Sequence, residues 1–182
     1  AIHMNNIDCT DVWDLTAAEI TGRQRVMWAV KALQKHAPGF SKARLRTIGA
    51  SLGTRESRKI IGDYNLTEED VLNQKRFSDS IGIFPEFLDG HKIAILPSTG
   101  RYFEVSYRIT IPQNVENLLV AGRSVAGDKI SHAATRQMMC CTVTGQGAGV
   151  GAAISLEDNV TPRQVNIAKL QDALKAQGVR LH

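Results

Sequence analysis

Residues 117–153 read NLLVAGRSVAGDKISHAATRQMMCCTVTGQGAGVGAA, and this stretch carries the strongest structural signal in the chain. It predicts a short buried strand at 118–121, a polar loop over 123–136 and a helix that begins near Met138. Small residues make up most of that helix, so another backbone or a flat ligand can approach it closely. Its first turn offers N–H groups that lack intrahelical partners, together with the positive end of the helix dipole. The stretch therefore predicts a close-packing helix whose amino end suits an electron-rich group.

The rest of the chain predicts helices and strands in mixed order. The sequence Thr16-Ala-Ala-Glu19 is typical of a capping box, and the helix that it opens should end before Pro38. Thr67 should cap a short helix, and a last amphipathic helix should end at Gly178. Four further strands are expected at residues 44–49, 57–66, 92–96 and 102–111. This order argues against a helical bundle or a β-sandwich and predicts an α/β fold of mixed α+β character.

Charge and composition are those of an ordinary globular chain. The 22 Lys and Arg residues against 18 Asp and Glu give a net charge of +4, which is too small and too scattered to indicate nucleic-acid binding. We expect no membrane partner and a cytoplasmic location, because no apolar run reaches bilayer length and no signal peptide is recognisable. The three cysteines and five histidines lack the spacing of a disulfide framework or a metal site, so no metal is expected.

The 117–153 stretch resembles the flavin-contacting C-terminal motif of a family of FAD-dependent oxidoreductases. These are two-domain flavoproteins of the glutathione-reductase type, distantly similar to fumarate reductases. Typical members carry a run like LLVAGRxxxxxxxAxxxxRxMxxCxxxGQAAGxAAA. The positions that match it are Leu118–Arg123, Arg136, Met138, Cys141, Gly145–Gln146 and Ala148–Gly149. Upstream, residues 55–67 (RESRKIIGDYNLT) look like the family's RESRRIxGEYxLT block, so the resemblance covers nearly the whole chain.

One part of the family pattern is missing from this sequence. Members begin with a strand, a GxGxxG turn and a helix that hold the ADP half of FAD. The nearest string here, 145–151, lies inside the small-residue helix and has no strand before it. The resemblance therefore implies the C-terminal part of a two-domain FAD-binding fold that lacks the N-terminal Rossmann βαβ unit. It implies a helical segment at 1–39 linking to that unit, a substrate-side sheet region at 40–115 and a return to the FAD-binding domain at 116–182.

The resemblance assigns flavin contacts to the first turn of the long helix. Its backbone would stabilise the negative charge that a reduced flavin gathers near N1 and O2. The alternative is a plain buried helix. The four residues concerned are Met139, Cys140, Cys141 and Thr142.

The loop before that helix supplies the remaining cofactor residues. Gly122 and Arg123 would run beside the ribityl chain and the pyrophosphate, where the Arg123 fork would bind an oxyanion. A surface ion pair is the alternative role for Arg123. Asp128 would accept ribityl hydroxyls, although the loop departs from the family pattern in this region.

Three residues are candidates for the substrate side. His132 and Arg136 have a spacing that resembles the carboxylate-binding His and Arg of fumarate-reductase-like flavoproteins, and His132 could transfer the substrate proton. Tyr107 could donate a proton or form a wall of the site, and a packed strand aromatic is the alternative. In the 55–67 block, Arg55 and Arg58 favour structural ion pairs over ligand contacts.

Together these expectations imply the C-terminal portion or small subunit of an FAD-dependent oxidoreductase. It would move hydride or electrons between a small organic substrate and flavin N5. An N-terminal Rossmann-containing chain or segment would complete the site, and an oligomer is expected because the small-residue helix needs a cover. The alternative is a non-catalytic accessory subunit that keeps the flavoprotein fold without bound flavin.

Overall fold

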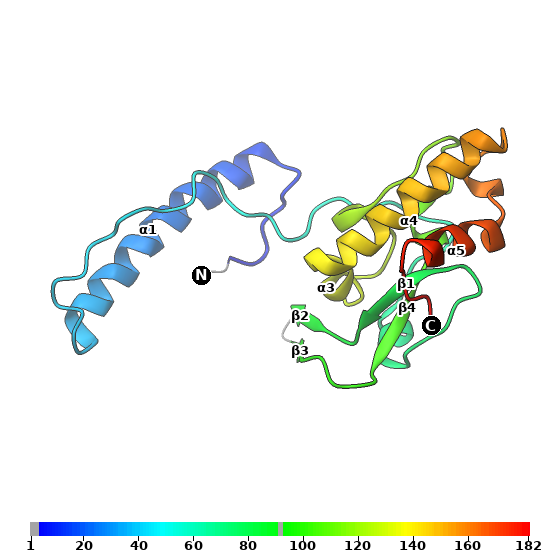
Figure 1. Cartoon of the computed structure of the whole chain (residues 1–182). Coiled ribbons are helices and arrows are strands. Elements are labelled where there is room, and N and C mark those ends of the chain that lie inside the picture. The colour runs from blue at the N-terminus through cyan, green and yellow to red at the C-terminus, as the bar shows by residue number, and fades with distance from the viewer. Residues whose placement is uncertain (1–3, 91–92) are drawn as a thin grey trace. The chain divides into compact units, whose positions relative to one another are not determined.

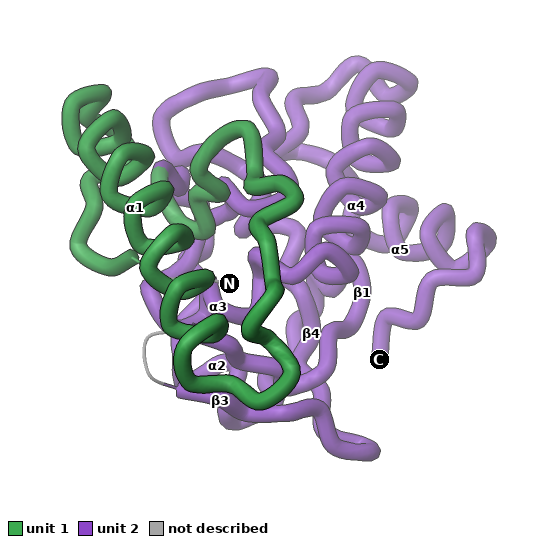
Figure 2. Tube along the Cα trace, turned by 90° about the vertical axis from the view of Figure 1, so that its left-hand side faces the viewer, with its two compact units in different colours: residues 1–57 green, residues 58–182 purple. Residues whose placement is uncertain are grey.

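The structure, a computed structural model, describes residues 4–90 and 93–182. The chain divides into two compact units, residues 1–57 and residues 58–182 (Figure 2). The first unit contains one long helix and a segment that returns along it. The second contains two small antiparallel sheets and the remaining helices (Figure 1).

The helix of the first unit is α1 (Val12–His36). It begins four residues before the predicted cap, because the Asp11 carboxylate accepts hydrogen bonds from the N–H groups of Trp13 (2.6 Å) and Asp14 (3.2 Å). Thr16 lies inside the helix, so the predicted capping box is wrong. The predicted end before Pro38 is confirmed.

The segment that returns along α1 forms no strand over 44–49, contrary to the prediction. Side chains of α1 hold it instead: Gln34 Nε2 donates to the carbonyl of Ala43 (2.7 Å), and Arg23 donates to that of Ala50 (3.1 Å). Within the described part of this unit there is no neighbouring strand, so the backbone has no ladder to join.

The larger unit is built on two antiparallel strand pairs. β1 (Ser80–Pro85) pairs with β4 (Tyr102–Ser106), and β2 (Leu88–Gly90) pairs with β3 (Ile93–Ile95). The strand predicted at 92–96 is confirmed as β3, while Lys92 lies outside the described residues.

The strand predicted at 102–111 ends early, at Ser106. The next four residues form the 3-10 turn η1 (Tyr107–Thr110). The hydroxyl of Ser106 caps this turn by accepting from Arg108 N (3.2 Å), and the carbonyl of Asp79 accepts from Tyr107 N (2.9 Å). Polar groups from a distant segment therefore stop the strand.

Two other predicted strands are replaced by irregular chain. In place of a strand over 57–66, the segment makes isolated bridges, Gly62 with Pro112 and Leu66 with Gly127. In place of a strand over 118–121, the chain enters the 3-10 turn η2 (Gly122–Ser124), and Val120 N donates to Thr110 O (2.8 Å). Both segments lie beside turns rather than strands, so a continuous ladder does not form.

The helices of this unit follow their local signals. Thr67 caps α2 as predicted and forms a capping box with Asp70, and Gly178 (φ +84°) follows α5 as predicted. One short helix lies inside the predicted polar loop. The elements are α2 (Glu68–Leu72), α3 (His132–Thr135), α4 (Met138–Glu157), the 3-10 turn η3 (Pro162–Gln164) and α5 (Ile167–Ala176).

Helix α4 packs closely against β1 and η1, and two glycines make this possible (Figure 1). A Cβ added at Gly147 would lie 2.5 Å from Ile81 Cδ1 and 2.9 Å from its Cβ. A Cβ at Gly151 would lie 2.5–2.9 Å from the ring and hydroxyl of Tyr107. Because Ile81 Cβ is fixed to the backbone and the Tyr107 ring is buried, these positions require glycine.

We expect Gly151→Ala to lower the free energy of unfolding by about 1–3 kcal/mol, because the added methyl overlaps the buried Tyr107 ring. The matched control is Gly149→Ala on the same helix, where a Cβ meets nothing within 4 Å. Helix propensity should make that variant more stable by up to about 1 kcal/mol. Urea unfolding of the two variants measures both effects; equal stability of the pair would contradict the packing.

Candidate functional site

The amino end of α4 is open to solvent. Its N-cap residue, Gln137, makes no side-chain capping bond, and its side-chain amide instead donates to Ala133 O (3.1 Å). Met138 and Met139 are 86% and 74% exposed. Cys140 of the same turn is fully buried. The first-turn N–H groups thus have no side-chain acceptor at the cap, which an anion-binding helix end requires.

One face of α4 continues this open surface along the helix. Thr142, Gly145 and Gly149 are exposed, and a Cβ built at either glycine meets nothing within 4 Å. Leu156, at the other end of the same face, is 83% exposed. Helix α4 therefore has a packed face with Gly147 and Gly151 and an open face that has little side-chain bulk around Gly145 and Gly149.

By length and composition α4 could also cross a membrane, which corrects the expectation that no apolar run is long enough. One such helix among the described residues carries little weight, because core helices pass the same test. Helix α4 also packs against β1 and α5.

The turn η2 lies against α4 and brings two predicted cofactor residues to its first half. Gly122 (φ +72°) donates its N–H to Thr144 Oγ1 (3.0 Å), and Arg123, which follows it, is exposed. Burial raises the pKa of the Cys141 thiol, while the positive charge of Arg123 opposes that rise. Arg123 is therefore electrostatically close to the first turn of α4.

Asp128 serves as a double cap within the chain. One carboxylate oxygen accepts from Glu68 N (2.6 Å), and the other accepts from the N–H groups of Ile130 (2.9 Å) and Ser131 (2.7 Å). Lys59 Nζ donates to its carbonyl (3.2 Å). These contacts tie the loop before α3 to the start of α2, a structural role that the sequence did not indicate.

His132 is the first residue of the short helix α3 and Arg136 is its C-cap; α3 packs on β2. His132 is 1% exposed, and the Arg136 side chain is 12% exposed. The Arg136 guanidinium donates to the carbonyl of Asp89 and lies 3.5 Å from its carboxylate. The structure therefore places both predicted substrate residues at α3, with His132 buried and Arg136 largely covered beside the exposed Asp89.

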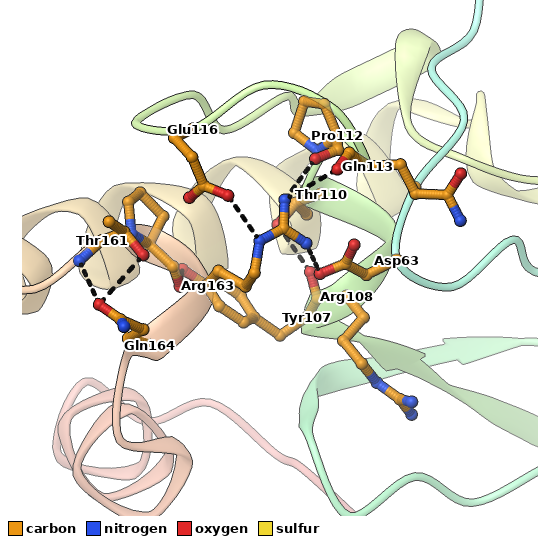
Figure 3. Close-up of polar contacts among 12 residues, drawn as sticks. Asp63, Tyr107, Arg108, Thr110, Pro112, Gln113, Glu116, Thr161, Arg163 and Gln164 are labelled. Atoms are coloured by element: carbon orange, nitrogen blue, oxygen red, sulfur yellow. Dashed lines mark hydrogen bonds and ion pairs between the residues drawn. The ribbon is translucent and has the colours of Figure 1, made fainter.

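Tyr107 lies in the core of the larger unit, 1% exposed (Figure 3). Its hydroxyl donates to Pro162 O (3.1 Å), and burial raises its pKa to about 12. This location agrees with the alternative of a packed aromatic, in a turn rather than a strand.

Charged groups hold the segments on either side of this ring. Arg163 donates to Asp63, to Glu116 (3.1 Å) and to Pro112 O (2.7 Å) (Figure 3). Burial would raise the pKa of Asp79, but hydrogen bonds from Arg108 and Ser106 outweigh it and lower that pKa. These ion pairs hold distant segments together around Tyr107.

The sequence did not indicate the role of Thr144, and it did not indicate the contacts that residues 58–66 make. Thr144 holds η2, but a threonine among small helical residues gives no separate signal. Residues 58–66 lie between two other segments: Ile60 N donates to Ser124 O (3.0 Å), and Gln113 N donates to Ile61 O (3.0 Å). No group of three metal-ligating side chains is found in 4–90 or 93–182.

Helix α4 thus has an N-terminus without a side-chain cap, and the exposed Arg123 of η2 lies close to its first turn. Residues 1–174 match the family model described as FAD dependent oxidoreductase. The chain therefore belongs to the FAD-dependent oxidoreductase family, which implies a flavin-linked redox role and FAD as the cofactor. It has no significant match among curated proteins or among solved structures.

Asp128→Ala should lower the free energy of unfolding by about 2–4 kcal/mol, because three backbone N–H groups lose a charged acceptor. Asp128→Asn keeps one acceptor oxygen and should lose less than half as much. Chemical unfolding of both variants measures the difference. Equal losses would show that the carboxylate does not act as a double cap.

Tyr107→Phe should cost about 0.5–1.5 kcal/mol of stability, the value of one hydrogen bond to Pro162 O. It should leave the bound flavin and its absorbance unchanged, since the ring still fills the core. Thermal unfolding and the visible spectrum of the assembled protein report the two effects. Loss of the flavin spectrum in a folded variant would show that Tyr107 contributes to flavin binding.

Proposed function

We propose that this chain is the C-terminal part of an FAD-dependent oxidoreductase and that the amino end of α4 binds the flavin. The observation that carries this proposal is the exposed, uncapped start of a 20-residue helix in a chain of this family. Such an end stabilises negative charge on a group that lies against it.

The residues around this end fit FAD in three respects. The first turn has N–H donors without a side-chain cap, the glycines at 145 and 149 leave room for a flat ring, and Arg123 adds a cation for a phosphate. A ring system joined to a diphosphate requires a surface with small side chains, hydrogen-bond donors and a positive charge.

The cofactor and the residues around it then have separate roles. FAD, when bound, supplies hydride or two-electron transfer at N5. The backbone of Met139–Thr142 favours negative charge at the pyrimidine edge of the ring, and Gly122 and Arg123 bind the ribityl and phosphate side. Asp128 acts through the loop that it holds rather than by a ribityl contact of its own.

On the substrate side, Arg136, whose side chain is 12% exposed, is proposed to bind a carboxylate of a small organic substrate. His132 is proposed to pass a proton, and because it is 1% exposed in this chain, this role requires the packing around α3 to open to the substrate. The contact between Arg136 and the Asp89 carbonyl orients the guanidinium for carboxylate binding, and a guanidinium carries five N–H donors in a fixed geometry. The positions of His132 and Arg136 at the first residue and the C-cap of one short helix support the assignment.

The proposed partner is an N-terminal Rossmann-containing chain or segment that covers the open face of α4. The support is the lack of a GxGxxG unit in this sequence and the bare stripe of Thr142, Gly145 and Gly149. Kinship with glutathione-reductase-type enzymes follows from the resemblance. An oligomer follows from the small-residue helix that needs a cover, and a cytoplasmic location follows from the lack of a recognisable signal peptide; all three stay predictions.

An absorbance spectrum of the purified assembly tests the function. Bound flavin absorbs near about 450 nm, and intact mass spectrometry should find FAD together with the polypeptide that holds its ADP half. A complete assembly without flavin would instead support the accessory-subunit alternative.

Gly149→Leu should abolish assembly with that polypeptide and with it the bound FAD, because the side chain fills the open face. In the isolated chain it should not lower stability, since the position is open and leucine favours helix. Ala168→Leu, at an exposed position of α5, is the control and should retain both partner and flavin. Size-exclusion chromatography and flavin absorbance report the result; normal assembly of Gly149→Leu would contradict the proposed interface.

A further inference from the structure

Thr144 is a fully buried polar residue in the second turn of α4, with 0% exposure. A buried hydroxyl is costly unless it is hydrogen-bonded. The Oγ1 of Thr144 donates to the carbonyl of Cys141 (3.0 Å) and accepts from the N–H of Gly122 (3.0 Å). The hydroxyl therefore both donates and accepts, once inside the helix and once outside it.

The outside contact joins α4 to the turn η2. Gly122 adopts a left-handed conformation (φ +72°), and no side chain caps η2 at its N-cap residue, Ala121. The hydroxyl of Thr144 thus supplies an acceptor to the turn that η2 itself does not provide. Arg123 is the next residue along the chain, so its Cα lies about 3.8 Å from that of Gly122.

We infer that Thr144 is a positioning residue for the cofactor, which fixes the Gly122–Arg123 turn against the first turns of α4. This inference rests on the proposed function, because Arg123 is the residue proposed to bind the phosphate side of FAD. Thr144 does not itself touch the cofactor; it acts through the N–H of Gly122. Its hydroxyl is the required group, so serine should replace it and valine should not.

The variants are Thr144→Val, which keeps the shape and removes the hydroxyl, and Thr144→Ser, which keeps the hydroxyl. The matched control is Ser155→Ala. Ser155 is another buried hydroxyl of α4, and it donates to Ala152 O (2.8 Å) with the same i−3 spacing. It lies about three turns further along the helix than Thr144.

Two measurements are made on the assembled protein, well below its unfolding temperature. Amide hydrogen exchange at Gly122, with FAD removed, reports the tether without reference to flavin. Loss of one hydrogen bond should accelerate this exchange about tenfold in Thr144→Val. The dissociation constant for FAD should rise about tenfold in the same variant, with Thr144→Ser and Ser155→Ala both within about threefold of the parent.

The outcomes separate the inference from the proposed function. Faster exchange together with weaker FAD binding, rescued by serine, supports the inference. Faster exchange with unchanged FAD affinity overturns it, because Thr144 is then structural only. Unchanged exchange overturns the tether, and hence the inference, even if FAD binds. A parent protein that exchanges as expected but binds no FAD overturns the proposed function and, with it, any cofactor role for Thr144.

Discussion

The close approach of α4 to β1 and η1 is the constraint on which the larger unit depends. It exists because Gly147 and Gly151 present no side chain to Ile81 and Tyr107. The ring of Tyr107 then fills the space against α4, and its hydroxyl is satisfied by Pro162. Packing at this distance fixes the helix rigidly, and a rigid helix is a precondition for a precisely aimed amino end.

Polar side-chain contacts fix the loops of the larger unit in place. Asp128 ties the chain before α3 to the start of α2, and Thr144 holds η2 on α4. Arg163 binds Asp63 and the carbonyl of Pro112, which lie on two other segments. Each of these side chains satisfies backbone groups that irregular structure would otherwise leave without a partner. The irregular segments around the α4 end are therefore ordered by long-range hydrogen bonds rather than by a sheet.

The two faces of α4 have different roles, one in packing and one in binding. The packed face belongs to the core, while the open face and the exposed first turn remain for a ligand and a partner. Glycine serves both faces for different reasons: at positions 147 and 151 it permits contact within the chain, and at 145 and 149 it leaves an open surface. Membership in the FAD-dependent oxidoreductase family makes FAD the ligand to test at that surface.

The sequence by itself determined the features that local chemistry encodes. The Thr67 capping box, the long small-residue helix, the glycine after α5 and the family are all readable from neighbouring residues. The tertiary structure alone decided where β4 stops, that 118–121 is no strand, and that Asp128 and Tyr107 face inward. Those outcomes depend on hydrogen-bond partners far along the chain, such as Asp79 for η1 and Glu68 for Asp128. A local sequence pattern carries no information about which distant group will form the hydrogen bond.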